Sequence, residues 1–398
     1  MSPKKIMETW LKNKLRGDWQ IWFIIVLLSV FSMMVVYSAS SALAYKKAHG
    51  NTESYLITHT GHLLLGLFVI WVIHRIDYTK YAGISKLLLW ITPFLLLYTY
   101  LFGTTVGGTK RWISLFGISF QSSDFVRLVL ITNLAAMLAR RQNVEYTQTT
   151  LTGLIFWCGL LCGLLAITNF STAIILGVTC FLIMYMGRVP SRYLLRMAFS
   201  VIGALVIVMS ISIYLYSKGV EFGRGQVVLE RIEAFAKIDI NRDKEIGNPT
   251  RDDNFQKEQA MIAIARGGAI GIGPGNSFQR NYLPEAFSDY IYAIIVEEYG
   301  MLGAIFVMGL YLWLLYRGLK NVSNTQRAFG GLLCVGLTFS IVFQAFIHMF
   351  INVGLGPVTG QTLPLMSMGG TSILFTAVAI GIVLSVSKEE YDEKALND

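Results

Sequence analysis

Charged side chains and patterned cysteines are both scarce in this chain of 398 residues. Only 14% of the residues are charged, whereas 54% are hydrophobic; this balance excludes an ordinary soluble domain and predicts a polytopic membrane protein. The four cysteines lie inside apolar stretches, without the spacing of a disulfide framework or a structural zinc site. A Walker loop, a nucleophile elbow and a zincin motif are also missing, so nothing predicts nucleotide hydrolysis, serine hydrolase chemistry or zinc proteolysis.

Long apolar runs are abundant instead. At roughly 20 residues per crossing, they predict an all-α polytopic membrane protein with ten transmembrane helices. The predicted helices cover residues 20–41, 56–74, 85–102, 124–139, 150–168, 171–187, 195–217, 289–316, 327–351 and 370–387. Residues 1–19 and 388–398 are then short tails at either end of a transmembrane domain, 20–387, and residues 218–288 form one large loop between the seventh and eighth helices.

The distribution of basic residues predicts how the chain is oriented. The two tails and alternate connections hold 18 Lys and Arg residues, and the short connections on the opposite side hold four. Positively charged connections stay in the cytoplasm, so we expect cytoplasmic termini and an extracytoplasmic 218–288 loop. The net charge of +9 is therefore an orientation signal, and it predicts no nucleic-acid partner.

The large loop has internal patterns of its own. Residues 227–237 are spaced as an amphipathic helix on the membrane surface would be, and the polar residues 238–254 follow them. Helical periodicity returns at 256–266, ahead of a glycine-rich run at 267–275. These glycines do not sit between a strand and a helix of a dinucleotide-binding unit, so we expect them to allow sharp turns or the close approach of a ligand.

Two acids, Glu285 and Asp289, end this loop just before the eighth predicted helix. A carboxylate at the boundary between water and membrane is well placed to take a proton from a hydroxyl group. Asp289 is therefore the candidate general base. The alternative is that Ser288 or Asp289 only caps the helix, which is a common use of such residues.

Other polar residues near the membrane boundary have two interpretations each. Trp112, beside two cations, is either an aromatic belt residue or part of a binding surface. Arg127 either reaches the interface from its helix or holds an anionic ligand. At least one of Glu297 and Glu298 is expected to line a cavity or pair with another helix. The short-spaced pair His59 and His62, in the second predicted helix, favours hydrogen bonding between helices over a metal site.

Four motifs together resemble the SEDS proteins (shape, elongation, division and sporulation), the bacterial peptidoglycan polymerases of the FtsW and RodA type. The first is YLPEAFSDYIYAIIVEEYG at 282–300, and the second runs from Phe255 through the glycines to Ser277. The third is KRWI at 110–113 with QSSDFVRL at 121–128, and the fourth is LPLMSMGGTS at 363–372. The resemblance covers nearly the whole chain, from Gly17 to Ser387.

The resemblance implies a glycosyltransferase that polymerises lipid II into β-1,4 glycan strands for the cell wall, with inversion at the anomeric carbon. Asp289 stands where the family has its essential aspartate, which favours the general base over the helix cap. The implied substrate-binding residues are Lys110, Arg111, Trp112, Gln121, Arg127, Arg231, Gln256, Gln259, Ser277 and Glu285. No cofactor is required by these residues and no metal ligands are identified, although Mg²⁺ or Mn²⁺ would suit the leaving pyrophosphate. The implied partners are lipid II, a class B penicillin-binding transpeptidase, other division proteins and membrane lipid.

The chain also departs from the family pattern. Phe287 replaces a histidine, Arg127 a lysine, Asp124 a glutamate and Ser122 a proline, and a polar motif is degraded to ITNFST at 167–172. Thr362 is similar to the FtsW division branch, with a RodA-type elongation polymerase as the alternative branch. Two other classes of function compete with polymerisation: a flippase that transports lipid II, and a division scaffold that performs no chemistry.

Overall fold

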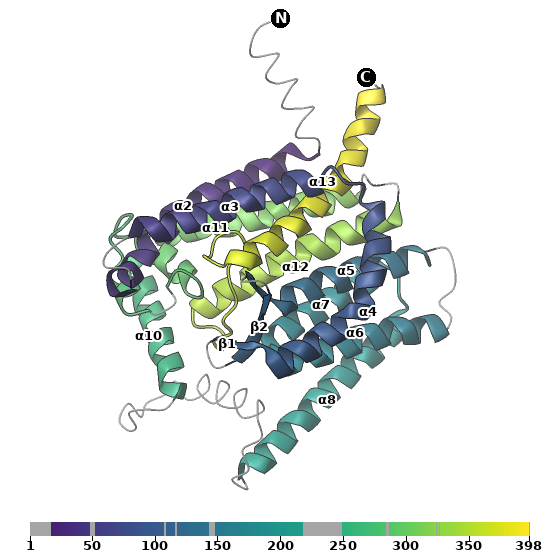
Figure 1. The fold of residues 1–398 in the computed structure, drawn as a ribbon, viewed down its shortest axis with the longest axis horizontal. Helices are drawn as coiled ribbons and strands as arrows, with labels where there is room; N and C mark the ends of the chain where they lie inside the picture. The colour runs from purple at the N-terminus through teal and green to yellow at the C-terminus, as the bar shows by residue number, and fades with distance from the viewer. Residues whose placement is uncertain are drawn as a thin grey trace, which may run out of the picture.

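The computed structural model describes residues 17–47, 52–106, 109–115, 118–142, 148–217, 249–283, 286–323, 325 and 327–397. Nearly all of them belong to helices that form one bundle (Figure 1). The helices are α2 (Trp19–Lys47), α3 (Thr52–Ile73), α4 (Thr79–Phe102), α5 (Ser122–Ala139), α6 (Gln148–Thr168), α7 (Phe170–Met186), α8 (Ser191–Ser217), α10 (Pro249–Gly267), α11 (Ile291–Ser323), α12 (Ala328–Asn352) and α13 (Gly370–Asn397), with a 3₁₀ turn, η1 (Gln279–Asn281).

Each of the ten predicted ranges falls on one of these helices, because an apolar run long enough to cross a membrane satisfies its backbone only as a helix. Within the described residues, eight helices are long and apolar enough to cross: α2 to α6 and α11 to α13. The mostly helical membrane fold is thus confirmed. α7, with 17 residues, is shorter, and α8 is not among the eight, so ten crossings stay a prediction.

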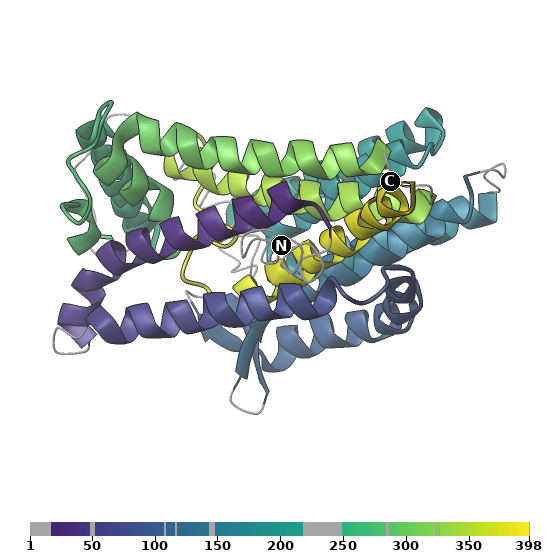
Figure 2. The ribbon, with the colours of Figure 1, turned by 90° about the horizontal axis from the view of Figure 1, so that it is seen from above.

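The expectation of an all-α protein is wrong in one place. Three strands, β1 (Thr104–Val106), β2 (Thr109–Leu115) and β3 (Ile118–Gln121), form a small antiparallel sheet in the order β1-β2-β3. Trp112 faces Gln121 and Ile113 faces Phe120 across β2 and β3. Residues of neighbouring strands pair with each other, and the sheet projects beside α4 (Figure 2). Apolar and polar residues alternate along Ile118–Gln121, which suits a pleated sheet because successive side chains point to opposite faces.

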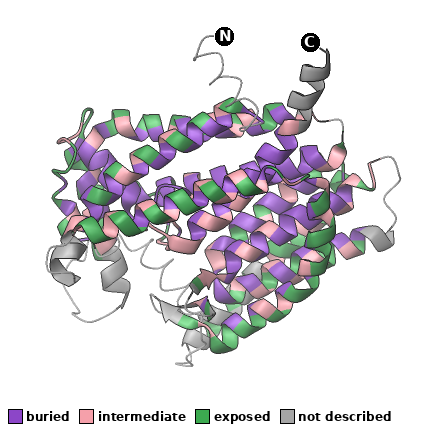
Figure 3. Cartoon of the chain, turned by 45° about the horizontal axis from the view of Figure 1, so that its top comes forward, coloured by how far each residue is buried: buried purple, intermediate pink, exposed green. Residues whose placement is uncertain are grey.

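The core lies between α5, α12 and α13. In the most apolar 18-residue stretch of each of these helices, 72% to 78% of the residues are buried, compared with 22% and 28% in α3 and α4. Figure 3 shows the buried residues on the inner faces of the helices and the exposed ones on the outer faces. Large apolar side chains are exposed on the outer faces, among them Phe68, Phe94 and Phe199. That pattern is expected of helices that meet lipid tails rather than water.

One polar cluster joins the two ends of the chain. The backbone N–H of Asp18 donates to the Ser387 hydroxyl at 3.0 Å, and Arg317 on α11 forms an ion pair with the Asp18 carboxylate at 2.6 Å. The start of α2 and the end of the apolar part of α13 therefore lie at the same end of the bundle. Since α12 follows α11 back across the bundle, its last residue, Asn352, lies at the opposite end.

Candidate functional site

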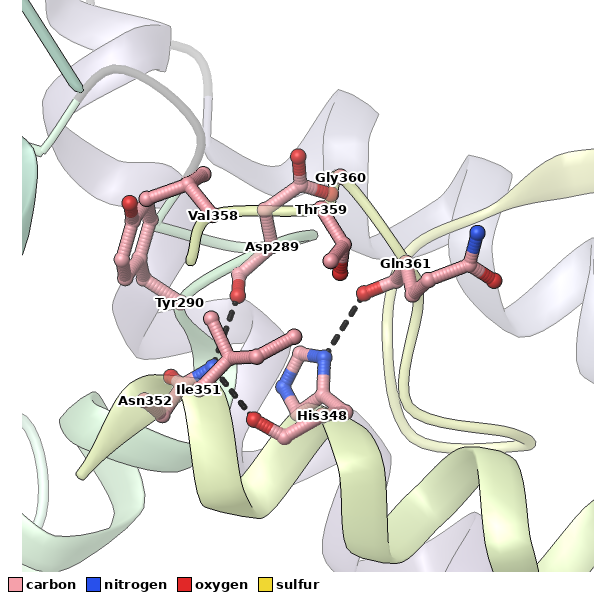
Figure 4. Close-up of a pocket in the computed structure, with 9 residues that line it drawn as sticks. All are labelled: Asp289, Tyr290, His348, Ile351, Asn352, Val358, Thr359, Gly360 and Gln361. Atoms are coloured by element: carbon pink, nitrogen blue, oxygen red, sulfur yellow. Dashed lines mark hydrogen bonds between the residues drawn. The ribbon is translucent and has the colours of Figure 1, made fainter. Parts of the chain in front are cut away.

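A small pocket surrounds Asp289 at the end of the bundle opposite Asp18 (Figure 4). Three segments build it: the last residues before α11, the last turns of α12, and the chain that follows α12. The lining residues are Asp289, Tyr290, His348, Ile351, Asn352, Val358, Thr359, Gly360 and Gln361. The chain that follows α12 contributes residues 358–361 to this lining, and irregular backbone inside a membrane is tolerated where it lines a cavity.

Asn352 fixes the main chain of Asp289. Its amide donates to the carbonyl oxygens of Asp289 and His348, both at 2.9 Å. Its side-chain oxygen accepts the N–H of Ala293 at 3.1 Å, which also donates to the carbonyl oxygen of Tyr290 at 3.0 Å. That N–H is satisfied from α12, so it does not require the Asp289 carboxylate as a cap. The carboxylate instead accepts a hydrogen bond from the Ser288 hydroxyl at 3.0 Å.

Arg111, on β2, reaches the same pocket. Its guanidinium donates to the carbonyl oxygen of Thr359 at 3.4 Å. A Cβ atom added to Gly360 would lie 3.1 Å from Arg111 Nη1 and 3.3 Å from Asp289 Oδ2. Gly360 also has a φ of +63°, which favours glycine. The absence of a side chain at this position thus lets the predicted cation and the predicted base approach each other.

Arg127 is buried on α5 and does not line this pocket. Its exposed fraction is 5%, so the alternative in which it reaches the membrane interface is wrong. One guanidinium nitrogen pairs with Asp124 at 3.3 Å and another donates to the side-chain oxygen of Gln344 on α12. The Gln344 amide in turn donates to the carbonyl oxygen of Thr362 at 2.9 Å. Arg127 therefore connects α5 to α12 and to the chain just beyond the pocket.

The glycine-rich run packs against α11. A Cβ atom on Gly267 would lie 2.0 Å from the carbonyl oxygen of Val296, and one on Gly271 would lie 2.2 Å from that of Glu298. α11 itself is kinked at Gly300, where φ is +67°. These glycines allow backbone to approach backbone, and the packing explains them without a bulky ligand.

Glu297 and Glu298 hold the turn that follows the glycines, as expected of acids inside a bundle. Glu297 accepts the Ser277 hydroxyl at 2.5 Å and the N–H groups of Phe278 and Gln279 at 3.2 and 3.3 Å. Glu298 accepts the N–H of Ser277 at 3.3 Å and the hydroxyl of Ser38 on α2. Ser277 is buried by these contacts and lies outside the Asp289 pocket.

The remaining predicted substrate-binding residues are spread around the pocket. Trp112 and Gln121 are partly buried and face each other in the sheet. Gln256 and Gln259 are partly buried on α10 and do not line the pocket. The side chains of Lys110, Arg231 and Glu285, and the predicted amphipathic helix at 227–237, lie outside the described residues.

The structure gives no support for a metal centre in its described part, where no three His, Cys, Asp or Glu side chains group together. His59 lies 2.7 Å from the Ser32 hydroxyl, which also donates to the carbonyl oxygen of Met366. The predicted bonding between helices is therefore confirmed for His59. Of the residues that line the pocket, the sequence analysis predicted only Asp289 as a site residue. It missed His348, Asn352 and Gln361, among others, because no local pattern connects them to Asp289.

Comparisons with known proteins agree over nearly the whole chain. The family model FTSW_RODA_SPOVE, described as "Cell cycle protein", matches residues 18–392. A probable peptidoglycan glycosyltransferase FtsW of Coxiella burnetii is 30% identical over 390 residues, covering 95% of this chain and 98% of that one. A probable peptidoglycan glycosyltransferase FtsW of Geobacter sulfurreducens is 31% identical over 378 residues, which cover 94% of this chain and 95% of that one.

Solved structures share the fold. RodA of Thermus thermophilus, a rod shape determining protein, superposes with a TM-score of 0.66 at 20% identity and covers 95% of this chain and 99% of its own. A chain from a structure titled as a peptidoglycan synthase complex that coordinates polymerization and crosslinking superposes with a TM-score of 0.72 at 21% identity, covering 94% and 98%.

Proposed function

The chain belongs to the FtsW, RodA and SpoVE family of cell cycle proteins, and from this premise we propose that it is a peptidoglycan glycosyltransferase of the FtsW type. It joins lipid II molecules into β-1,4 glycan strands for the division septum. The observation that carries the proposal is the approach of Arg111 to Asp289 around Gly360, at the wall of the pocket that Asp289 and Gly360 line. The curated relatives named above favour the division branch over the RodA branch.

The proposed reaction is a displacement at an anomeric carbon. The 4-hydroxyl of the GlcNAc on one lipid II attacks C1 of the MurNAc on another, and the bond from C1 to the pyrophosphate oxygen breaks. The hydroxyl proton goes to the Asp289 carboxylate, and the pyrophosphate leaves with the bonding electrons. A general base within reach of the hydroxyl and a cation beside the leaving group are the two requirements of this step.

Arg111 is the cation that the geometry favours for the pyrophosphate, because a guanidinium binds phosphate oxygens through two parallel hydrogen bonds. Lys110 and Arg231 remain candidates for the same role. Trp112, Gln121, Gln256 and Gln259 are proposed to contact the sugars or the lipid around this centre. Arg127, Ser277 and Glu285 are proposed to support it by holding neighbouring segments in place. A Mg²⁺ or Mn²⁺ ion bound to the leaving pyrophosphate is compatible with this arrangement.

We place the protein in the plasma membrane with ten crossings and both termini in the cytoplasm. The Asp18 contacts to Ser387 and Arg317 support termini on one side, and the excess of basic residues in that set of connections supports the cytoplasm for it. The Asp289 pocket then opens on the extracytoplasmic side, where glycan strands are assembled.

We also propose a class B penicillin-binding transpeptidase as partner, together with other division proteins. The support is the shared fold with a chain of a peptidoglycan synthase complex. A polymerase and a crosslinking enzyme act on the same strand in turn, so a stable complex would shorten the path between them.

The decisive experiment compares Asp289→Asn with the unchanged protein. Purified protein with its transpeptidase partner receives lipid II, and glycan chains are read on a gel. Asn keeps the shape of Asp but cannot accept a proton, so we expect a loss of polymer of about 10²-fold to 10⁴-fold with normal folding. Glu285→Gln should do less harm.

The matched control is Asp77→Asn. Asp77 also stands two residues before a helix and caps α4 by accepting the N–H of Thr79 at 2.9 Å, but it lies outside the pocket. Near-normal polymer from Asp289→Asn would remove the catalytic assignment. Lipid II transport that persists in Asp289→Asn while no polymer forms from the unchanged protein would favour a flippase, and transpeptidase binding without either activity would favour a scaffold.

A further inference from the structure

The turn at residues 363–368, part of the motif LPLMSMGGTS, has no role in the reaction above. Its own backbone closes it, because the N–H groups of Met366 and Ser367 both donate to the carbonyl oxygen of Leu363, at 3.0 and 2.9 Å. The Leu363 N–H donates in return to the Ser367 hydroxyl at 2.8 Å. Ser367 is only 1% exposed, so its hydroxyl group is held inside the protein at the end of this turn.

Two helices from different parts of the chain anchor the turn. The hydroxyl of Tyr311, on α11, donates to the carbonyl oxygen of Pro364 at 2.5 Å. The hydroxyl of Ser32, on α2, donates to the carbonyl oxygen of Met366 at 2.8 Å. Tyr311 and Ser32 are both fully buried, and a buried polar group is costly to separate from its partner. The bundle therefore determines where the turn lies.

The turn in turn holds the segment that ends at Asp289. The N–H of Met368 donates to the carbonyl oxygen of Phe287 at 3.0 Å. The hydroxyl of Ser367 donates to the carbonyl oxygen of Ser288 at 2.7 Å. The next carbonyl, that of Asp289, is held from α12 through the amide described above. Three consecutive carbonyl groups are thus each fixed by a donor from the last turn of α12 or the chain that follows it.

This arrangement matters because a general base must be placed accurately. The carboxylate of Asp289 is turned toward Gly360 (Figure 4), where a Cβ atom would lie 3.3 Å from Oδ2. Catalytic groups have to be held within about 0.5 Å of the productive geometry. A displacement of about 1 Å can cost about 10²-fold in rate. Anchors on the main chain of Asp289 therefore bear directly on the reaction.

We propose that Ser367 is a positioning residue for Asp289, an inference that rests on the proposed function. The Ser288 carbonyl that Ser367 binds belongs to the same peptide group as the Asp289 nitrogen. Its hydroxyl therefore fixes the peptide from which the Asp289 side chain departs, and with it the direction of the carboxylate. Ser367 does not line the pocket, so it acts through Asp289 and takes no proton itself.

The test uses the full chain with its transpeptidase partner, and measures the initial rate of elongation over a range of lipid II concentrations. In Ser367→Ala we expect kcat to fall at least tenfold. KM should change less than threefold, because the base acts in the reaction step and contributes little to binding of the ground state.

Ser385→Ala is the matched control. The Ser385 hydroxyl also donates to a backbone carbonyl, that of Ile76, at 2.5 Å, and its exposed fraction is 4%, but it lies near the Asp18 end of the bundle. Each substitution deletes one buried donor, so the two should lower Tm by similar amounts, and only Ser367→Ala should lose kcat. If Ser367→Ala is too unstable to purify, Ser367→Cys replaces it. A thiol is of similar size but a weak donor, and we expect kcat to fall at least threefold.

A kcat of Ser367→Ala within twofold of the unchanged protein would overturn the positioning role. An equal loss of kcat in Ser385→Ala would do the same, as would an effect confined to KM. Asp289→Asn, run in parallel, separates the two proposals. If Asp289→Asn is inactive and Ser367→Ala is normal, only the positioning role fails. If Asp289→Asn elongates at a near-normal rate, the assignment of the base fails and the positioning role fails with it.

Discussion

At the residue scale, the most informative side chain outside the pocket is Arg127, because its guanidinium is shared between Asp124 and Gln344. Arg127→Ala leaves the buried Asp124 carboxylate without its cation, and removing one partner of a buried pair costs about 3–5 kcal/mol. We expect a lower thermal unfolding temperature and severely reduced use of lipid II. Arg127→Lys should recover only part of the lost thermal stability and lipid II use, since an ammonium group cannot reproduce the planar set of hydrogen-bond donors of a guanidinium group.

Asp124→Ala combined with Arg127→Ala is the control, because it removes both charges. We expect it to recover much of the thermal stability that Arg127→Ala loses. An unchanged unfolding temperature in Arg127→Ala, together with weak lipid II binding, would instead assign Arg127 to the pyrophosphate.

At the element scale, the kink of α11 depends on Gly300. Its φ of +67° costs other residues about 1–2 kcal/mol, and a Cβ atom there would lie 2.4 Å from the backbone nitrogen of Gly271. Gly300→Ala should therefore displace the glycine-rich run and lower both the unfolding temperature and the activity, which are measured on the purified protein.

Gly309 on the same helix provides the comparison, since a Cβ atom there meets nothing within 4 Å. Gly309→Ala should leave stability unchanged or raise it by up to about 1 kcal/mol, as alanine favours helix. Equal losses in both variants would show that α11 tolerates no alanine and that the kink has no special part.

At the scale of the whole molecule, we expect the transpeptidase to dock on the exposed apolar side of α11 that carries Met301 and Phe306. Met301 and Phe306 are 60% and 47% exposed, whereas Met308 and Trp313, and Phe346 on α12, are only partly exposed. In α12, 78% of the most apolar stretch is buried, so α12 offers little surface to a partner. Cysteines at Met301 and Phe306 should crosslink to the transmembrane helix of the partner.

Phe94→Cys on α4 is the control, because Phe94 is 72% exposed and lies on another face of the bundle. Equal capture at Phe94 and Phe306 would mean that the crosslinks report only random encounters in the membrane. No capture at either α11 position would exclude this face.

The sequence by itself determined where the helices lie, because the length of an apolar run is a local property and a membrane leaves a helix as its only solution. It also singled out Asp289 and Arg111 individually, through their charge at the membrane boundary and the motifs around them. It did not predict the β1–β3 sheet, which depends on pairing between residues of neighbouring strands.

Only the tertiary structure decided which of these residues meet. Arg111 and Asp289 approach each other because Gly360, from a third segment, has no side chain between them. His348 and Asn352 enter the pocket because α12 ends beside the start of α11. Contacts between distant segments depend on how helices pack and turn, which no local pattern encodes. For the same reason the glycine-rich run, which looks like a ligand site in the sequence, is occupied by the backbone of α11.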